Sequence, residues 1–148
     1  MKALSLTQPW ASLVACGAKR IETRSWSTAY RGPLAIHAAM GFPAWARWVA
    51  FECRSHLELA GHTIGEPRGE RDRLIHDLPL GMVIATCRVV RCARTELIVS
   101  QISDQERAFG DYSSGRYAWM LADIVRLPEP IPVRGALGLW EWQELEGA

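Results

Sequence analysis

The stretch SLTQPWASLVACGAKRIETRSWSTAYRGPLAIHAA, residues 5–39, carries the strongest structural signals in the chain. An apolar segment at 3–6 leads into it and predicts a strand. Polar residues then precede Pro9, which is favoured in the first turn of a helix. Apolar residues recur at helical spacing up to Gly17, a typical helix end: Trp10, Leu13 and Val14. We therefore predict a strand followed by a short helix.

Further strands are predicted at 20–26, 34–39, 82–90, 117–127 and 137–142, and helices at 43–60 and just before Gly110. The polar segment 62–79 contains Gly, Pro and charges of alternating sign, which predicts a flexible loop. Two Pro-rich turns are expected after residue 127. The strands and helices do not alternate strictly, and 148 residues suit one domain. We therefore predict a single domain, 1–148, of the α+β class, with a curled mixed sheet or small barrel at its centre.

The formal net charge of +1 is too small for a protein that binds long duplexes by counterion release. Between residues 8 and 31, however, four cations accompany a single carboxylate, Glu22. The four cations are Lys19, Arg20, Arg24 and Arg31. A local cationic patch of this kind suits a compact anionic ligand or a short run of phosphates.

The cysteines and the apolar runs bear on cofactors and on cellular location. The four cysteines form no C-x-x-C pair, so we expect free thiols, no metal site and no cofactor. No apolar run reaches the roughly 18 residues needed to cross a bilayer, and the N-terminus becomes polar too early for a secretory signal. We therefore expect a cytoplasmic protein with no membrane partner.

A set of polar and aromatic side chains comes from residues 8–26. Gln8 stands beside Trp10 at the predicted helix N-terminus, where unpaired backbone amides favour an anion or a carbonyl oxygen. In the strand that follows, a period of two places Glu22, Arg24 and Trp26 on one face. An indole can stack on a base, a carboxylate can accept from an exocyclic amine, and a guanidinium can bind phosphate. The sequence therefore predicts a cationic, aromatic cleft that holds a nucleotide-like group.

These residues also have a purely structural interpretation. Glu22 and Arg24 can simply pair with each other, and Trp26 can belong to the core. His37 lies in an apolar strand, where a histidine is more often a hydrogen-bonded core residue than a functional one.

Aromatic and cationic residues outside this stretch are less specific. Arg116 and Tyr117 follow the GDYSSG segment, and they either close over a ligand or stay in an exposed loop. Most of the remaining tryptophans are expected in the core: Trp45, Trp48, Trp119, Trp140 and Trp142.

The motifs QPWASLV at 8–14, GAKRIETRSW at 17–26 and YRGPLAIHAA at 30–39 resemble the ASCH domain family, named for activating signal cointegrator homology. The later segments GRYAWML and GALGLW fit the same family, and 62–79 is then an insertion. The resemblance implies a small PUA-like β-barrel with flanking helices and a cleft beside the first helix. It also implies binding of RNA, single-stranded nucleic acid or a modified nucleoside. The motif positions are Gln8, Trp10, Lys19, Glu22, Arg24 and Trp26, with Tyr30, Arg31 and His37 alongside.

One branch of similar proteins hydrolyses N4-acylated cytidine with a Lys and a Thr of a G-x-K-x-x-T-x-R motif. This chain keeps Lys19 and Arg24 but has Glu22 at the Thr position, and a carboxylate cannot replace a hydroxyl as an acyl nucleophile. Strand alternation turns the adjacent Thr23 to the other face. The alternative function is a hydrolase in which Glu22 acts as general base beside Lys19, or a ribonuclease that adds His37. Binding is favoured over catalysis because no nucleophile or metal set is evident, and a protein-interaction module with a protein partner is the third hypothesis.

Overall fold

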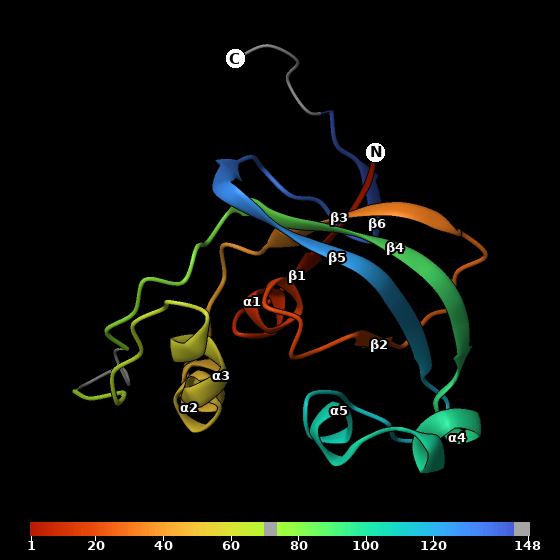
Figure 1. The fold of residues 1–148 in the computed structure, drawn as a ribbon, viewed down its shortest axis with the longest axis horizontal. Helices are drawn as coiled ribbons and strands as arrows, with labels where there is room; N and C mark the ends of the chain where they lie inside the picture. The colour runs from red at the N-terminus through yellow and green to blue at the C-terminus, as the bar shows by residue number, and fades with distance from the viewer. Residues whose placement is uncertain (70–73, 144–148) are drawn as a thin grey trace.

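The computed structural model describes residues 1–69 and 74–143 (Figure 1). Within these ranges six strands form one sheet: β1 Lys2–Leu6, β2 Ile21–Arg24, β3 Gly32–Ala38, β4 Met82–Arg94, β5 Tyr117–Pro132 and β6 Leu139–Glu141. The helices of the same ranges are α1 Trp10–Ala15, α2 Ala44–Glu52, α3 Arg54–Leu59, α4 Thr95–Ile98 and α5 Asp104–Ala108, with a 3₁₀ turn at Val99–Gln101. None of the helices in this part of the chain is long and apolar enough to cross a bilayer.

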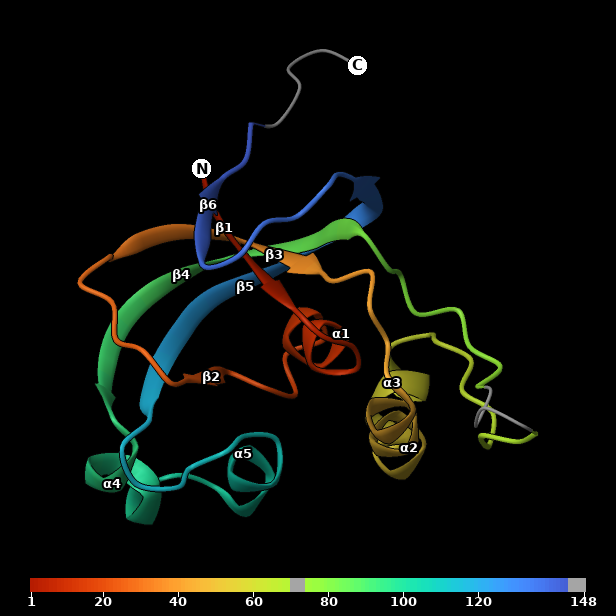
Figure 2. The same ribbon diagram turned by 180° about the vertical axis from the view of Figure 1, so that it is seen from behind.

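The strands follow the order β2-β5-β4-β3-β1-β6, so β2 and β6 form the edges of the sheet. Neighbouring strands are antiparallel except β1 and β3, which are parallel because α1 and β2 lie between them in the chain. β4 and β5 are the longest strands, and their pairing shifts register three times. Because such irregularities increase the local twist, the two strands curl around α1 and give the sheet the shape of a half-barrel (Figure 1, Figure 2).

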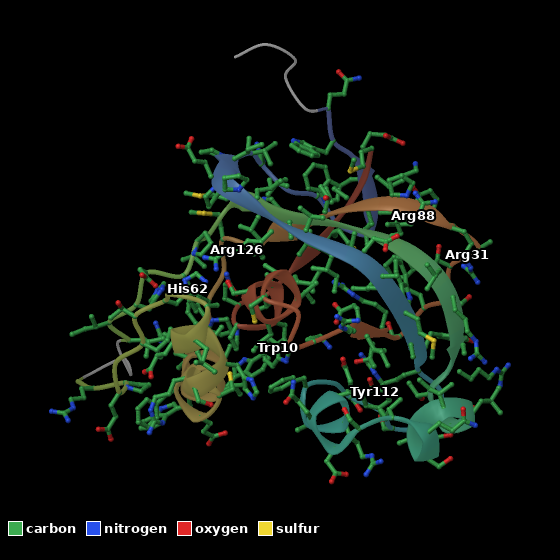
Figure 3. All side chains as sticks on the ribbon, in the orientation of Figure 1. Trp10, Arg31, His62, Arg88, Tyr112 and Arg126 are labelled. Carbon is green, nitrogen blue, oxygen red and sulfur yellow. The ribbon has the colours of Figure 1, made fainter. Side chains whose placement is uncertain are left out.

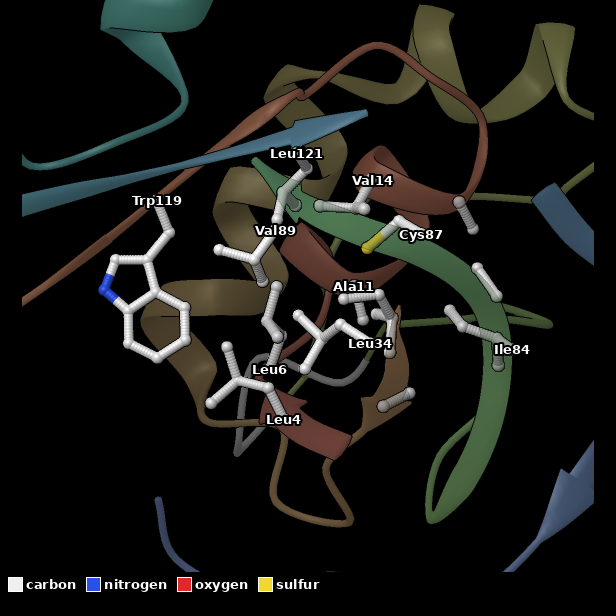
Figure 4. Close-up of a cluster of buried hydrophobic side chains, with 14 residues drawn as sticks. Leu4, Leu6, Ala11, Val14, Leu34, Ile84, Cys87, Val89, Trp119 and Leu121 are labelled. Atoms are coloured by element: carbon white, nitrogen blue, oxygen red, sulfur yellow. The ribbon is translucent and has the colours of Figure 1, made fainter. Parts of the chain in front are cut away.

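α1 fills the concave face of this sheet. Its residues Ala11, Leu13 and Val14 are completely buried, as expected for a helix that is apolar on all sides. Ala11 and Val14 belong to the main core with side chains from β1, β3, β4 and β5, among them the fully buried Trp119 (Figure 4). Leu13 faces the other way and packs with Leu57 of α3. The short helix therefore joins the sheet to the helices outside it.

The predicted α+β class with a curled sheet is confirmed, but several boundaries differ from the sequence-based expectation. β5 runs through Pro128 and Pro130, where turns are predicted. β2 pairs only with the first residues of β5, so the later part of β5 is not paired with β2 on that side. Proline, which has no backbone N–H to donate, is tolerated at such a free edge. The predicted helix 43–60 is divided at Cys53 into α2 and α3.

The segment 62–79 is predicted as a flexible loop. Its described parts, 62–69 and 74–79, contain no helix or strand apart from single bridges, such as the one between Ile64 and His76. Residues 70–73 lie outside the described residues, and the flexibility of the segment stays a prediction.

Candidate functional site

A cleft of 640 Å³ opens between the end of β1, the start of α1, β2 and the segment that leads from α5 into β5. Its lining includes three indoles and four charged side chains. The indoles belong to Trp10, Trp26 and Trp45, and the charges to Glu22, Arg24, Asp111 and Arg116. A volume of this size lies within the range of about 300–1,000 Å³ that is common for small-ligand sites. The cleft is therefore the first candidate for a functional site.

The indoles come from three different elements. Trp10 opens α1, and its ring centroid lies 5.5 Å from that of Trp45 on α2, with the planes tilted by 43°. Trp26 follows β2 and packs edge-on against buried Trp119, with centroids 4.8 Å apart. The Trp119 indole N–H also donates to the carbonyl of Trp26, at 3.3 Å. The core thus fixes Trp26, while Trp10 and Trp45 face each other across the start of α1 and α2.

Trp45 is 63% exposed, so it is not one of the tryptophans of the core, where most of the five outside the 8–26 stretch are expected. Trp48 is also partly exposed, at 37%. The reason is that α2 buries only its small residues Ala46 and Ala50, which let the helix lie close to the domain. The larger indole of Trp45 remains at the mouth of the cleft.

The cleft lies over a buried cation, Lys19. Its Nζ donates to the carbonyls of Ile21, at 2.5 Å, and Phe109, at 2.9 Å, and lies 3.6 Å from Oε1 of Glu22. Burial lowers the pKa of Lys19, and the attraction of the Glu22 and Glu106 carboxylates opposes that shift. Two carbonyls thus accept from the ammonium, and the Glu22 carboxylate forms an ion pair with it. The side chain is 0% exposed, so it supports the wall of the cleft rather than its surface.

Glu22 connects Lys19 to the surface of the cleft. Its Oε2 accepts from Nε of Arg24 at 3.1 Å, and Nη2 of Arg24 donates to the carbonyl of Ser5 at 2.8 Å. The two side chains are only 11% and 25% exposed. A continuous polar chain therefore runs from Lys19 through β2 to the end of β1, and it fixes the carboxylate and the guanidinium in place.

The opposite wall is formed by Asp111 and Arg116. Hydrogen bonds from the side chain and backbone of Ser113 lower the pKa of Asp111, and Arg116 lowers it further. Arg116 Nε lies 3.4 Å from Oδ2 of Asp111, and its Nη2 donates to the carbonyl of Thr23 at 3.2 Å. Thr23 Oγ1 in turn accepts from the backbone N–H of Asp111 at 3.0 Å. These bonds attach the segment before β5 to the edge strand β2.

The four charges of the cleft cancel, which corrects the expectation of a cationic pocket. Two carboxylates, Glu22 and Asp111, compensate two guanidiniums, Arg24 and Arg116. The excess of positive charge between residues 8 and 31 comes from cations that do not line the cleft. Lys19 is buried beneath it, and Arg20 and Arg31 are exposed elsewhere.

Gln8 is completely buried and does not line the cleft. Its Oε1 accepts from the backbone N–H of Ser12 at 3.0 Å, and its Nε2 donates to Ser12 Oγ at 2.7 Å and to the carbonyl of Pro79 at 3.0 Å. The amide of Gln8 thus satisfies the first turn of α1 and attaches the segment before β4 to it. The expectation that Gln8 and this helix N-terminus face a ligand is not met, because their polar groups already bond to the protein.

Four other predicted residues also lie away from the cleft. His37 is buried, and its ring nitrogens bond to Ser5 Oγ at 2.9 Å and to the carbonyl of Val133 at 2.8 Å. The Tyr30 hydroxyl and the Arg31 guanidinium bond to nearby carbonyls, and Arg31 lies far from Trp10 (Figure 3). Tyr117 is half-buried against the main core. In residues 1–69 and 74–143, no group of three or more His, Cys, Asp or Glu side chains could hold a metal ion.

Among the tryptophans and charged residues of the cleft, two were not sequence-based candidates. Asp111 belongs to the GDYSSG segment that precedes Arg116, and its acidic side chain gave no sign of a role in a site expected to be cationic. Trp45 has the spacing of a core residue, and only the packing of α2 shows its exposure.

The curled sheet around a buried helix, with helices on its flanks, defines a PUA-like α+β domain. The sequence profile of the ASCH domain matches residues 4–130, and the chain belongs to the ASCH domain family. This family is generally linked to RNA binding.

Activating signal cointegrator 1 of Homo sapiens and of Mus musculus are relatives in sequence, each 27% identical over 138 residues. The matched region is 93% of this chain but 22% of each relative, so the chain spans about a fifth of their length. Crystal structures of ASCH from Zymomonas mobilis and of a point mutant of it share the fold. Each superposition covers 98% of this chain and has a TM-score of 0.53. The unsubstituted protein is 15% identical, with 88% of its chain covered. The mutant is 14% identical, with 91% of its chain covered.

Proposed function

We propose that the cleft binds a base of single-stranded RNA or a modified nucleoside. The observation that carries the proposal is the grouping of Trp10, Trp26 and Trp45 around a cavity that is large enough for one nucleotide. Base–aromatic stacking contributes roughly 1–3 kcal/mol per base and suits any base, since every base has a π-face. An unstacked base is available in single strands and loops rather than in duplexes.

The polar groups of the cleft are suited to the edge and the attached phosphate of such a base. Within the described residues, Nη1 of Arg24 and Nη1 of Arg116 have no protein acceptor, so each guanidinium keeps donors for a ligand. The Glu22 and Asp111 carboxylates add acceptors for an exocyclic amine. Because these charges cancel, the arrangement favours one nucleotide held by stacking over a long run of phosphates.

Hydrolysis of an acylated nucleoside or of RNA is the second candidate. The observation in its favour is that Glu22 lines the cleft with its carboxylate held by two cations, in a position where it could act on a water molecule. This candidate would rest on Glu22, because the Lys19 ammonium is used within the protein and His37 lies outside the cleft.

Titration of the tryptophan fluorescence with nucleosides, including N4-acetylcytidine, and with short single-stranded RNA and DNA tests the binding proposal. Trp45→Ala should weaken binding by about tenfold, which corresponds to one lost stacking contact. Trp48→Ala is the matched control, because Trp48 lies on the same helix and does not line the cleft. Equal effects of the two substitutions would contradict binding in the cleft. The absence of any response would favour a protein partner.

Chromatography of the same mixtures tests the hydrolase candidate. Product that forms with the native protein but not with Glu22→Gln would support Glu22 as the general base. Equal turnover by both proteins would remove Glu22 from the mechanism, and absence of product would leave binding as the function.

A further inference from the structure

A second cavity, of 770 Å³, lies between the 61–80 segment and the C-terminal half of β5. It shares no lining residue with the cleft, so the two are separate sites. Part of its wall comes from Ser12 and Ala15 of α1, which therefore separates the two cavities. A ligand of this cavity would be independent of the nucleotide proposed for the cleft.

Most of the wall of the second cavity is apolar. β4 contributes Met82 and Ile84, the 61–80 segment contributes Leu78 and Leu80, and β5 contributes Leu127. Four prolines complete it: Pro79, Pro128, Pro130 and Pro132. Proline rings are rigid and apolar, so this surface suits a flat hydrophobic group.

One end of the cavity is polar and carries one cation, Arg126, and one carboxylate, Asp77, which bonds to His62 rather than to Arg126. Nη1 of Arg126 donates to the carbonyl of Ala60 at 2.6 Å, and its Nη2 lies 3.4 Å from Nε2 of His62 (Figure 3). The other ring nitrogen of His62 lies 3.3 Å from Oδ1 of Asp77. Among the described residues, no carboxylate lies within 4.0 Å of the Arg126 guanidinium.

The state of His62 leaves the positive charge on Arg126. Burial lowers the pKa of His62 and the adjacent guanidinium lowers it further, while the Asp77 carboxylate opposes the shift without reversing it. The neutral ring then donates from Nδ1 to Asp77 and accepts from Arg126 at Nε2. Only part of the five N–H donors of Arg126 is used in this way, and the rest remain beside an apolar wall.

We propose that this cavity binds a small, flat, apolar carboxylate, with its ring against the proline-rich wall and its carboxylate on Arg126. A planar guanidinium matches the two oxygens of a carboxylate. A carboxylate also brings only one negative charge to Arg126, whereas a phosphate would bring a second one close to Asp77. The combination of a mainly apolar pocket and one oriented charged group is typical of small-molecule sites.

Titration with 2-naphthoate, followed by amide chemical shifts in NMR spectra, tests the proposal. We expect saturable shifts at residues that line the second cavity, such as Gly61, Leu80 and Leu127, and none at Glu22 or Asp111 of the cleft. Naphthalene-2-methanol, which has the same ring system without the charge, should bind about tenfold more weakly.

Arg126→Gln should weaken 2-naphthoate binding by about tenfold, because it removes the charge. Arg88→Gln is the matched control: Arg88 is an exposed arginine of the neighbouring strand β4, outside both cavities, and its loss should change nothing (Figure 3). Trp45→Ala should also leave naphthoate binding unchanged, which separates this site from the proposed nucleotide cleft. Shifts confined to the cleft, equal binding of the acid and the alcohol, or equal affinity in Arg126→Gln would each overturn the proposal.

Discussion

The ammonium of Lys19 connects groups that are far apart in the chain. It bonds to the carbonyls of Ile21 and Phe109 and lies beside Glu22, while it is itself 0% exposed. Burying an ammonium costs free energy unless it is paired and hydrogen-bonded, and here two carbonyls and one carboxylate surround it. Its contacts hold the segment after α5 against β2, together with the bonds that Asp111 and Arg116 make to Thr23.

Lys19→Met should lower the free energy of unfolding by about 3 kcal/mol, because it leaves two carbonyls without their donor and removes one of the two cations paired with the buried Glu22 carboxylate. Urea denaturation measures the change. Lys2→Met is the control: Lys2 pairs with Glu141 at the surface, at 2.7 Å, and the loss should stay below about 1 kcal/mol. The double change Lys19→Met with Glu22→Gln should cost less than the sum of the two single changes. Equal losses for Lys19→Met and Lys2→Met would contradict this account.

Two histidines of the 62–79 segment should make the fold sensitive to mild acid. Burial lowers the pKa of His62, with a further contribution from Arg126, and burial also lowers the pKa of His76. The unfolded chain therefore takes up protons near pH 6.5, whereas the folded chain resists them to lower pH. The stabilisation is complete above about pH 6.5 and is lost as the pH falls through the window below that value.

Urea denaturation at about pH 7.5 and about pH 5.5 measures this effect. The native protein should lose stability between the two values, and a His62→Gln, His76→Gln variant should lose less. Carboxyls such as Asp111 and Glu96, whose pKa values lie below their ordinary range, titrate at still lower pH and do not contribute in this window. The same loss in both proteins would show that these histidines are not responsible.

At the scale of elements, α1 depends on Gln8 more than on its own residues. The helix has six residues, too few to be stable alone, and no side chain caps its Pro9 end. Gln8 replaces the missing cap by accepting from the N–H of Ser12 and donating to Ser12 Oγ and to the carbonyl of Pro79. One amide thereby joins the start of α1 to the segment before β4.

Gln8→Glu retains the shape of the side chain and removes both of its N–H donors. We expect the free energy of unfolding to fall by at least about 2 kcal/mol, because the carboxylate would be buried with two acceptors facing it. Thermal or urea denaturation measures the loss. Gln101→Glu, at an exposed position, is the control and should change stability by less than about 0.5 kcal/mol. A neutral effect of Gln8→Glu would mean that α1 does not need this amide.

For the molecule as a whole, the small net charge and the balanced cleft limit how binding can respond to salt. The chain carries +1 overall, and the two guanidiniums of the cleft are matched by two carboxylates. The affinity of a protein for single-stranded nucleic acid falls as salt is added. For each phosphate neutralised, log K decreases by about 0.7 per unit of log salt concentration. Few phosphates can therefore be neutralised in the cleft.

We expect the affinity for short single-stranded RNA to fall with salt, with a slope no steeper than about −1.4, which corresponds to two phosphates. Fluorescence anisotropy of a labelled oligonucleotide between about 50 and about 200 mM salt gives the slope. Arg116→Gln should make the slope shallower, and Arg107→Gln, at a surface ion pair outside the cleft, should not. A much steeper slope would show that cations outside the cleft, such as Arg88 and Arg31, carry the contact with nucleic acid.

The sequence by itself determined most elements, the fold class and one wall of the cleft. Helix and strand periodicity act over a few residues, so α1 and the strands could be predicted from local patterns. The segment 22–26 was also recognised as part of the site, and Glu22, Arg24 and Trp26 line the cleft; Thr23 and Ser25 line it too, although a period of two turns them to the other face. These features depend on residues that are neighbours in the chain.

Only the tertiary structure decided which of these groups remain accessible and what faces them. The burial of Lys19 depends on Phe109, which lies 90 residues away, and Asp111 reaches Thr23 across 88 residues. Trp45 stays exposed because α2 packs through its alanines, and Arg126 meets His62 only because β5 continues past the 61–80 segment. Local patterns cannot specify such contacts, since burial and pairing at long range depend on how all the elements pack together.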